Sequence, residues 1–266
     1  MKISGKTFVV TGAGNGIGRE VTLQLLAAGA SVAGVDLNKD GLGKTAALAN
    51  VGDRFSAHVV NITERDAVAS LPAAVEAVHG PADAVINVAG VIQKFVKVAD
   101  LPYSEIEKVM NVNFWGTMNM VTSFLPVLTS RPEAALVNVA SMGAYAPVPG
   151  QAVYGASKAA VKVLTEALYA ELLDTSVAVT VIFPGAIGTD IAANSGVALS
   201  DGSSHDAPAY KTTPPSTAAA VIIDAVVKGK YRATIGSDAA AMDKLSRLSP
   251  RRATTLIAKQ MGSLLH

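Results

Sequence analysis

The chain has 266 residues, of which half are hydrophobic and only 16% are charged, a composition that supports a large buried core and argues against disorder. Its 22 basic and 21 acidic residues give a formal net charge of +1, so no overall field favours nucleic acid or an anionic membrane as a partner. The absence of cysteine excludes disulfides, thiolate metal sites and cysteine nucleophiles.

Short apolar runs alternate along the chain with segments of helix length. Several runs are apolar on both faces, as strands buried in a parallel sheet must be. The predicted strands are Thr7–Thr11, Ser31–Val35, Arg54–Val59, Ala84–Asn87, Ala134–Val139, Ala178–Phe183 and Tyr231–Ile235. Repeated strand–helix units of this kind predict an α/β fold, with a single doubly wound parallel sheet, helices on both faces and one domain over residues 1–266.

Several helices are predicted from the signals at their ends. The first, Ile17–Ala28, begins after a run of glycines and stops before another glycine. Thr63 with Asp66, and Ser104 with Glu107, have the spacing of capping boxes and predict the starts of two further helices.

The uncharged segment Val109–Ser130 is long enough to cross a bilayer, but it contains three asparagines, which would be costly there. We therefore predict a buried helix and disfavour membrane association. Glycines between positions 12 and 18 cut the first apolar run short, so no secretory signal is visible and a cytoplasmic location is expected.

The stretch Ala186–Pro215 is the one long irregular piece, rich in small and polar residues. A loop of this length in a compact domain is usually a lid or disordered, and we predict a mobile substrate lid over residues 190–213. A basic extension follows at 238–266, because the last 39 residues hold eight Lys or Arg against two Asp. Subunit packing or a solvated face is the favoured interpretation of this extension, ahead of a peripheral membrane helix.

A glycine-rich turn follows the first predicted strand, with glycines at 12, 14, 16 and 18. Such a turn lets the backbone approach a ligand closely, and the helix that starts there offers free N–H groups to a pyrophosphate. Asp36 ends the second strand, where a carboxylate can accept hydrogen bonds from both ribose hydroxyls of NAD and repel the 2′-phosphate of NADP. The sequence therefore predicts NAD as the cofactor, with NADP less favoured. Asn38–Thr45 resembles a phosphate-binding loop but lacks its first glycine, and Lys44-Thr45 is interpreted as the exposed start of a helix.

A second group of chemistry-bearing residues lies downstream. Tyr154 and Lys158 are four residues apart on the helix predicted over Gln151–Leu173, so their side chains share a face. Ser141 comes just after a sheet strand and is separated from that helix by a Gly/Pro-rich loop that can fold back. A cationic lysine beside a tyrosine favours the phenolate, which suits proton exchange with an alcohol or ketone oxygen.

The sequence resembles the short-chain dehydrogenase/reductase family over about residues 5 to 235. The resemblance rests on Thr11-Gly-x-x-x-Gly16-x-Gly18, Asn87-Val-Ala-Gly90, Asn113, Ser141, Tyr154-x-x-x-Lys158 and Pro184-Gly185 followed by Thr189. It implies a Rossmann-type fold, a nicotinamide cofactor, hydride transfer to or from a secondary alcohol or ketone, and a homodimer or homotetramer formed through the helices near 105–129 and 151–173.

The resemblance also implies the roles of individual residues. Asn113, Ser141, Tyr154 and Lys158 form the implied catalytic tetrad, in which Asn113 holds a water that passes protons through Lys158. The cofactor-binding residues expected in all are Gly12, Asn15, Gly16, Ile17, Gly18, Asp36, Leu37, Asn61, Ile62, Asn87, Ala89, Gly90, Tyr154, Lys158, Pro184, Gly185, Ile187 and Thr189. Two positions depart from the family pattern: Val88 stands where a second Asn is frequent, and Asn61 stands where an Asp is usual.

Other functions are less well supported by the residues. A cofactor-binding regulator without turnover is the main alternative, although a pure binder has no need of all four tetrad residues. A sugar-nucleotide epimerase usually has a longer C-terminal domain, and a serine hydrolase would need a Gly-x before Ser141. His58, His79, His205 and His266 have no metal-ligand spacing, so no metal is predicted. An apolar substrate is expected from the candidate walls Val91, Ile92, Phe95, Met142 and Val148.

Overall fold

The computed structural model describes residues 1–197 and 212–262, and it confirms the predicted α/β class. Seven strands form one parallel sheet in the order β3-β2-β1-β4-β5-β6-β7. The strands are β1 Thr7–Thr11, β2 Ser31–Asp36, β3 Phe55–Val59, β4 Ala84–Asn87, β5 Ala134–Val139, β6 Val177–Pro184 and β7 Arg232–Ile235. The strand order reverses between β1 and β4, the point at which open α/β sheets bind their ligands.

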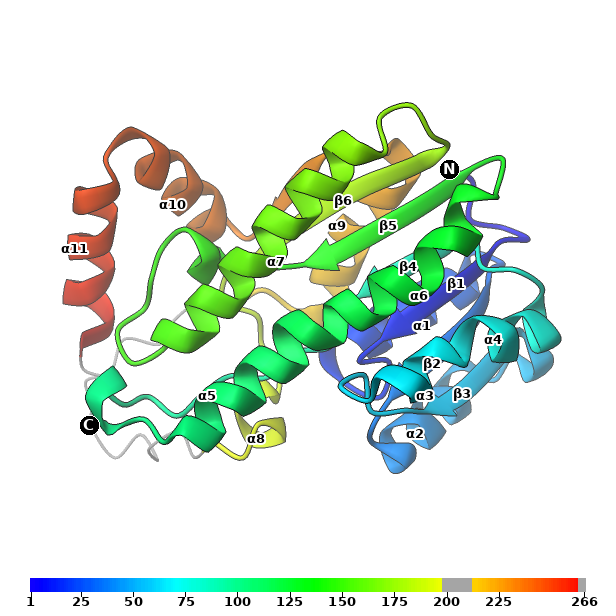
Figure 1. Ribbon diagram of the computed structural model, residues 1–266, viewed down its shortest axis with the longest axis horizontal. Helices are drawn as coiled ribbons and strands as arrows, with labels where there is room; N and C mark the ends of the chain where they lie inside the picture. Colours follow the sequence, from blue (N-terminus) through cyan, green and yellow to red (C-terminus); the bar gives the residue numbers. More distant parts are fainter. Residues whose placement is uncertain (198–211, 263–266) are drawn as a thin grey trace.

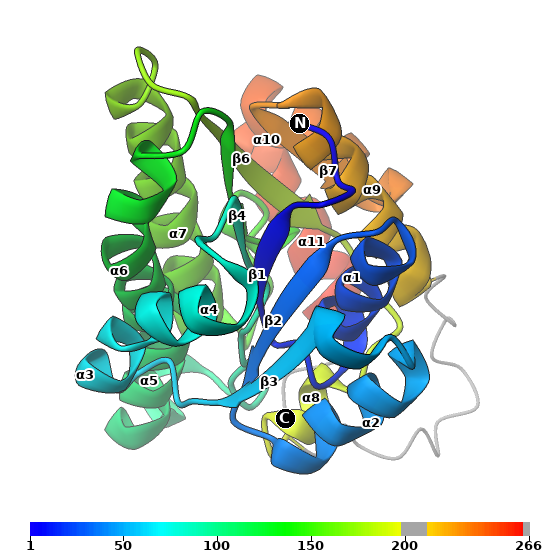
Figure 2. The ribbon, with the colours of Figure 1, turned by 90° about the vertical axis from the view of Figure 1, so that its right-hand side faces the viewer.

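Helices cover both faces of the sheet (Figure 2), as predicted. Helices α1, α2 and α9 lie on one face, and α3, α4, α6 and α7 lie on the other. The helices are α1 Gly16–Ala27, α2 Lys39–Ala49, α3 Arg65–Ala69, α4 Leu71–His79, α5 Tyr103–Met110, α6 Thr117–Thr129, α7 Ala152–Glu171, α8 Ile191–Asn194, α9 Pro215–Lys228, α10 Ser237–Leu248 and α11 Pro250–Met261. A π-helical turn, Asn111–Gly116, joins α5 to α6.

The alternation of side chains along the buried strands separates two cores. Phe8 and Val10 of β1 pack toward α1 and α9, whereas Val9 between them packs toward α4, α6 and α7. All three side chains are fully buried. Because both faces of the sheet are covered, these strands appear in the sequence as continuous apolar runs.

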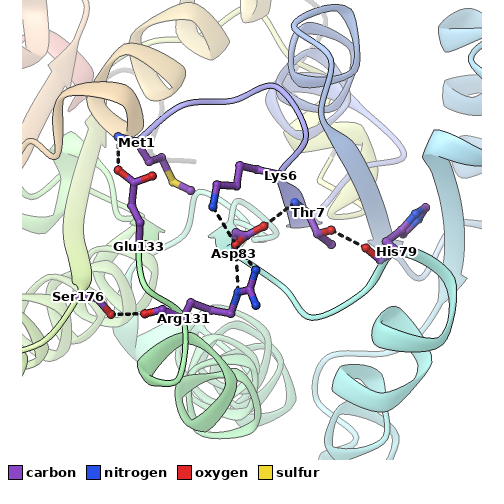
Figure 3. A network of polar contacts seen from close by, with 8 residues as sticks. All are labelled: Met1, Lys6, Thr7, His79, Asp83, Arg131, Glu133 and Ser176. Carbon is purple, nitrogen blue, oxygen red and sulfur yellow. Dashed lines mark hydrogen bonds and ion pairs between the residues drawn. The ribbon is translucent and has the colours of Figure 1, made fainter.

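A charged network closes the end of the sheet at which the strands begin (Figure 3). Asp83 is 3% exposed and accepts hydrogen bonds from Lys6 Nζ at 3.3 Å, Thr7 N at 3.0 Å and Arg131 Nη2 at 2.8 Å. The network ties β1, the start of β4 and the segment before β5 together at the end of the sheet opposite the glycine-rich turn.

The predicted capping boxes are wrong. Helix α3 begins at Arg65, because the Asn61 side chain accepts the N–H and hydroxyl of Thr63 and holds that residue in the preceding turn. Helix α5 begins at Tyr103, one residue before the predicted cap. Pro102 precedes it in an extended conformation, and the Pro102 carbonyl accepts a hydrogen bond from the N–H of Glu105.

The start of α2 also differs from the prediction. Its first residue is Lys39, and Asn38 caps it by accepting a hydrogen bond from Gly41 N at 2.9 Å. Thr45 is therefore not at an exposed helix start but fully buried within the helix, where its hydroxyl donates to Ala13 O at 2.8 Å.

The stretch 186–215, which was predicted to be irregular, contains a short helix near its start, and a β-bridge pairs its first residues with its last. Helix α8 covers Ile191–Asn194, and Ile187 forms an isolated parallel bridge with Thr213. Most of the proposed lid, residues 198–211, lies outside the described residues.

Helices α10 and α11 of the basic extension project to one side of the sheet (Figure 1) and pack against the segment that follows Ser141. Ala253 and Ile257 of α11 are buried against this segment, so the apolar side of that helix faces the protein. This packing counts against a peripheral membrane helix. Within 1–197 and 212–262, no helix is both long and apolar enough to cross a membrane.

Candidate active site

A cavity of about 380 Å³ lies where β1, β2, β3 and β4 end. Twelve of the predicted cofactor-binding residues line it, namely Gly12, Asn15, Gly16, Ile17, Gly18, Asp36, Leu37, Asn61, Ile62, Ala89, Gly90 and Thr189. Lining residues that were not predicted as cofactor contacts are Val35, Asn38, Val60, Val88, Val91, Val112, Ile191 and Asn194. Several of these are sequence neighbours of predicted residues: Val35 and Asn38 flank Asp36 and Leu37 at the end of β2, and Val60 precedes Asn61 after β3. Their place at a strand end could have indicated that they line the cavity.

Backbone packing explains the glycines of the turn. Gly12 has φ +72°, and a Cβ there would lie 3.1 Å from Ala89 N. A Cβ at Gly18 would overlap the Gly12 carbonyl. Gly16 has φ +50°, and a Cβ there would lie 3.2 Å from Cγ2 of Thr189. The wall of the cavity is therefore bare backbone at the start of α1. Its N-cap Asn15 makes no side-chain hydrogen bond to the described residues of the first turn, so this cradle fits a pyrophosphate.

Asp36 lies beside the turn at the end of β2. Its Oδ2 accepts a hydrogen bond from Gly14 N and its Oδ1 accepts one from Asn38 N, both at 2.9 Å. Each oxygen keeps further acceptor capacity, and the residue lines the cavity. The Arg19 side chain donates to Gly14 O and to Thr45 Oγ1, so it is engaged between α1 and α2.

Tyr154 and Lys158 lie one turn apart on α7, as their spacing predicts. Lys158 is 4% exposed, and its Nζ donates to Val139 O at 3.0 Å. Burial lowers the pKa of Lys158 from 10.5 to about 8. Burial also raises the pKa of Tyr154, and a hydrogen bond with Ser141 opposes that rise.

Ser141 begins a short turn, Met142–Ala144, and its Oγ accepts a hydrogen bond from Gly143 N at 3.1 Å. A Cβ at Gly143 would lie 3.5 Å from both Ser141 Oγ and Tyr154 Cε1, so the loop after β5 does fold back onto α7. The structure therefore brings Ser141 and Tyr154 together.

Asn113 lies fully buried in the π-helical turn. Its Oδ1 accepts from Val91 N at 2.8 Å, and its Nδ2 donates to Val91 O and to Ser157 Oγ, each at 2.9 Å. A Cβ at Gly90 would lie 3.0 Å from Lys158 Nζ and 3.1 Å from Asn113 Oδ1, which shows how close the two groups are. The Asn113 amide thus holds the backbone after β4 beside Lys158.

Six predicted cofactor residues are not part of the cavity wall: Tyr154 and Lys158 on α7, and Asn87, Pro184, Gly185 and Ile187. Asn87 is buried in the sheet and donates to Asn138 Oδ1 at 2.8 Å. Pro184 pairs with β7, while Gly185 and Ile187 lie in the turn that follows β6. Asp238 of α10 holds this turn by accepting from Ala186 N at 2.8 Å. The sequence pattern did not indicate Asp238, because its contact is made 52 residues away.

Apolar side chains pack against Tyr154. Ile92, Phe95, Ile191, Ala192 and Val197 form a cluster with its ring. Two of these, Ile92 and Phe95, were predicted as substrate walls. Met142 and Val148, also predicted as walls, pack against α10 and α11.

The arrangement of the acidic side chains and histidines also bears on metal binding. No cluster of three or more His, Asp or Glu side chains that could hold a metal ion occurs in residues 1–197 and 212–262. His58 and His79 instead share the hydroxyl of Ser56, each at 2.8 Å.

Known proteins resemble this chain in sequence and in fold. A Mycobacterium tuberculosis (strain H37Rv) protein that bears the name oxidoreductase SadH is 36% identical over 261 residues, which cover 96% of this chain and 94% of that protein. A Burkholderia cenocepacia short chain dehydrogenase solved with NADP is 26% identical, with a TM-score of 0.81 and coverage of 97% and 99% of the two chains. A Burkholderia phymatum short chain dehydrogenase/reductase solved with NAD shares the fold at 22% identity, with a TM-score of 0.84 and coverage of 94% and 95%.

The profile of the family described as short chain dehydrogenase matches residues 6–198. This match includes the glycine-rich turn, Asn113, Ser141, Tyr154 and Lys158. The chain therefore belongs to the short chain dehydrogenase family.

Proposed function

We propose that this oxidoreductase transfers hydride between NAD and an apolar secondary alcohol or ketone. The observation that carries the proposal is that Ser141 contacts Tyr154, one helical turn from Lys158, and that the Lys158 ammonium lies beside Gly90, which lines the glycine-rich cavity. A site that joins a proton-exchanging phenol to a nucleotide cradle suits coupled transfer of a proton and a hydride.

The side chains divide the chemistry between them. Ser141 donates a hydrogen bond to the substrate oxygen, where negative charge develops during reduction. Tyr154 gives a proton to that oxygen, or accepts one during alcohol oxidation. Burial disfavours the phenolate, and the hydrogen bond with Ser141 opposes this effect. The Lys158 ammonium, one turn away on α7, would favour the phenolate further. Asn113 fixes the backbone at Val91 and so keeps Gly90 beside Lys158.

The cavity fits a nicotinamide dinucleotide. A bound nicotinamide supplies or accepts the hydride, and this chain's residues hold it. The turn from Gly12 to Gly18 would hold the pyrophosphate, Asp36 the adenosine ribose, and Ala89, Gly90 and Thr189 the nicotinamide half. Relatives of this fold bind NAD or NADP, so the choice of NAD rests on the Asp36 carboxylate and its repulsion of a 2′-phosphate.

The substrate is proposed to be apolar because of the side chains around Tyr154. Ile92, Phe95 and Val197 give the phenol an apolar neighbourhood. An alcohol or ketone flanked by hydrocarbon would bury those groups, at about 25 cal/mol per Å² of apolar area removed from water.

We propose further that the protein is a homodimer or homotetramer that pairs through α5, α6 and α7. Large apolar side chains are exposed in this region: Trp115 of the π-helical turn is 52% exposed, Val163 of α7 is 60% exposed, and Leu173, two residues after α7, is 63% exposed. Exposed apolar residues grouped on neighbouring elements are typical of an interaction surface.

Replacing Tyr154 by phenylalanine tests the proposed function. Turnover on a secondary alcohol found by screening with NAD should fall on the order of 10²- to 10⁴-fold, because the proton donor is lost while the volume is kept. NADH binding, followed by fluorescence, should be nearly unchanged. Near-normal turnover of the variant would overturn the role of Tyr154. Tight NADH binding by the native protein without turnover on any alcohol would favour a regulator.

A further inference from the structure

Gln93 is a fully buried polar side chain in the loop that follows β4, outside the group of residues assigned to catalysis. Its Oε1 accepts hydrogen bonds from Val153 N at 2.9 Å and from Tyr154 N at 3.0 Å. Its Nε2 donates to Gly150 O at 2.9 Å. One side chain thus joins three backbone groups at the start of α7, one of which belongs to Tyr154.

These contacts make Gln93 the cap of the catalytic helix. The first N–H groups of a helix have no partner within it. The residue that precedes α7 is Gln151, and it makes no side-chain hydrogen bond to the first turn within the described part of the chain. Its Nε2 instead donates to Gln93 O at 2.6 Å. The two glutamines therefore lock the loop and the helix start together from both sides.

The loop that carries Gln93 is itself held in place. Asn113 binds both the N–H and the carbonyl of Val91, and Ser195 Oγ accepts from Ile92 N at 3.0 Å. Gln93 therefore transmits the position of a fixed loop, which begins at Gly90, to the backbone of Tyr154.

We propose that Gln93 is a positioning residue, which fixes the Tyr154 phenol relative to Ser141 and Lys158. This inference rests on the proposed function. Gln93 does not act on the reacting atoms, since its amide is used by Gly150, Val153 and Tyr154. Without the cap, the first turn of α7 can fray and carry Tyr154 with it. A displacement of about 1 Å in a reacting group can reduce the rate on the order of 10²-fold.

Two substitutions of Gln93 and one control test the proposal. Gln93→Leu removes all three hydrogen bonds at similar volume, whereas Gln93→Glu keeps an acceptor for the N–H groups of Val153 and Tyr154. Thr165→Val is the control, because it removes buried hydrogen bonds from the same helix three turns away, where Thr165 contacts Asn138 and Val161.

In Gln93→Leu, kcat should fall roughly 10- to 100-fold while NADH affinity stays within about threefold of the native value. Amide exchange at Val153 and Tyr154 should accelerate, and the phenol of Tyr154 should titrate at a higher pH as it loses the hydrogen bond with Ser141 that opposes the rise in its pKa. The phenol signal is read by NMR of ring-labelled tyrosine and assigned with Tyr154→Phe. Gln93→Glu should recover most of kcat, and Thr165→Val should lower stability without changing kcat or the phenol titration.

Unchanged amide exchange at Val153 and Tyr154 in Gln93→Leu would overturn the cap. An unchanged phenol titration, or an equal loss of kcat in Thr165→Val, would overturn the positioning role. If the native protein has no turnover, the proposed function fails, while amide exchange and the phenol titration still decide the role of Gln93.

Discussion

Replacing Lys158 by methionine should stabilise the fold while abolishing turnover. Lys158 is 4% exposed, and its ammonium donates a hydrogen bond to Val139 O at 3.0 Å. Burial lowers its pKa from 10.5 to about 8. One pKa unit corresponds to about 1.4 kcal/mol, so the buried cation is disfavoured by roughly 3 kcal/mol at neutral pH. Methionine removes this cost but loses a hydrogen bond worth about 1 kcal/mol, which leaves a net gain of about 2 kcal/mol.

The gain should depend on pH in a defined direction. Below pH 8 both the folded and the unfolded protein hold the Lys158 proton, and the full cost of the buried charge is present. Between pH 8 and 10.5 the folded protein releases the proton while the unfolded chain keeps it, so the native protein becomes more stable as pH rises. The variant lacks this rise, and its advantage should shrink over the same interval.

Urea unfolding of both proteins at several pH values measures the difference. Lys162→Met provides a matched control on α7, because Lys162 is 27% exposed and pairs with Glu166 at 2.7 Å. A partly exposed pair of this kind contributes less than about 1 kcal/mol, so the control should change stability little. The reasoning is refuted if Lys158→Met is less stable than the native protein at neutral pH, or if its advantage is the same at all pH values.

Two further predictions concern the cofactor and the assembly. Asp36→Asn keeps the shape of the side chain but removes its charge. The ratio of kcat/KM with NAD to kcat/KM with NADP should fall on the order of a hundredfold. An unchanged ratio would show that the carboxylate does not set the cofactor preference. Val163→Arg should convert the oligomer to monomers in sedimentation experiments, whereas Val227→Arg, at a site 45% exposed on α9, should leave the assembly intact; dissociation by both variants, or by neither, would contradict the proposed interface.

The parallel sheet could be predicted because its strands satisfy a local rule. Strands covered on both faces must be apolar throughout, and the predicted ranges of β1, β4 and β5 match the structure. The proximity of three candidate catalytic residues was also accessible, since Tyr154 and Lys158 share a helix face and Ser141 follows a strand whose end must lie at the same edge as the glycine-rich turn.

What sequence reasoning missed depends on contacts between distant segments. Helix α7 is capped by Gln93, about 60 residues earlier, and the turn after β6 is held by Asp238, 52 residues later. Neither residue has a local pattern that indicates its partner. The capping boxes at Thr63 and Ser104 failed for the opposite reason: their local pattern was present, but Asn61 and Pro102 offered the backbone a different arrangement.

The charged network at the opposite end of the sheet leads to a last prediction, because it should govern stability without affecting catalysis (Figure 3). Asp83→Asn keeps the shape and one acceptor for Thr7 N, but it removes the charge that faces Lys6 and Arg131. The Lys6 and Arg131 side chains are about a quarter exposed, so each can turn toward water when the charge is lost. The free energy of unfolding should therefore fall by about 2 kcal/mol, less than the 3–5 kcal/mol expected when the remaining charge stays buried.

For a chain of this size, about 2 kcal/mol should lower Tm by roughly 4–8 °C. Turnover per folded molecule should not change, since the network lies at the end where the strands begin and the cavity lies where they end. Asp224→Asn is the control, because that carboxylate pairs with Lys228 and Lys230 on the exposed surface and its loss should leave Tm nearly constant. A loss of kcat in Asp83→Asn at temperatures where the variant is fully folded would show that the two ends of the sheet are coupled. Equal Tm values for the two variants would mean that burial of Asp83 adds nothing to its ion pairs.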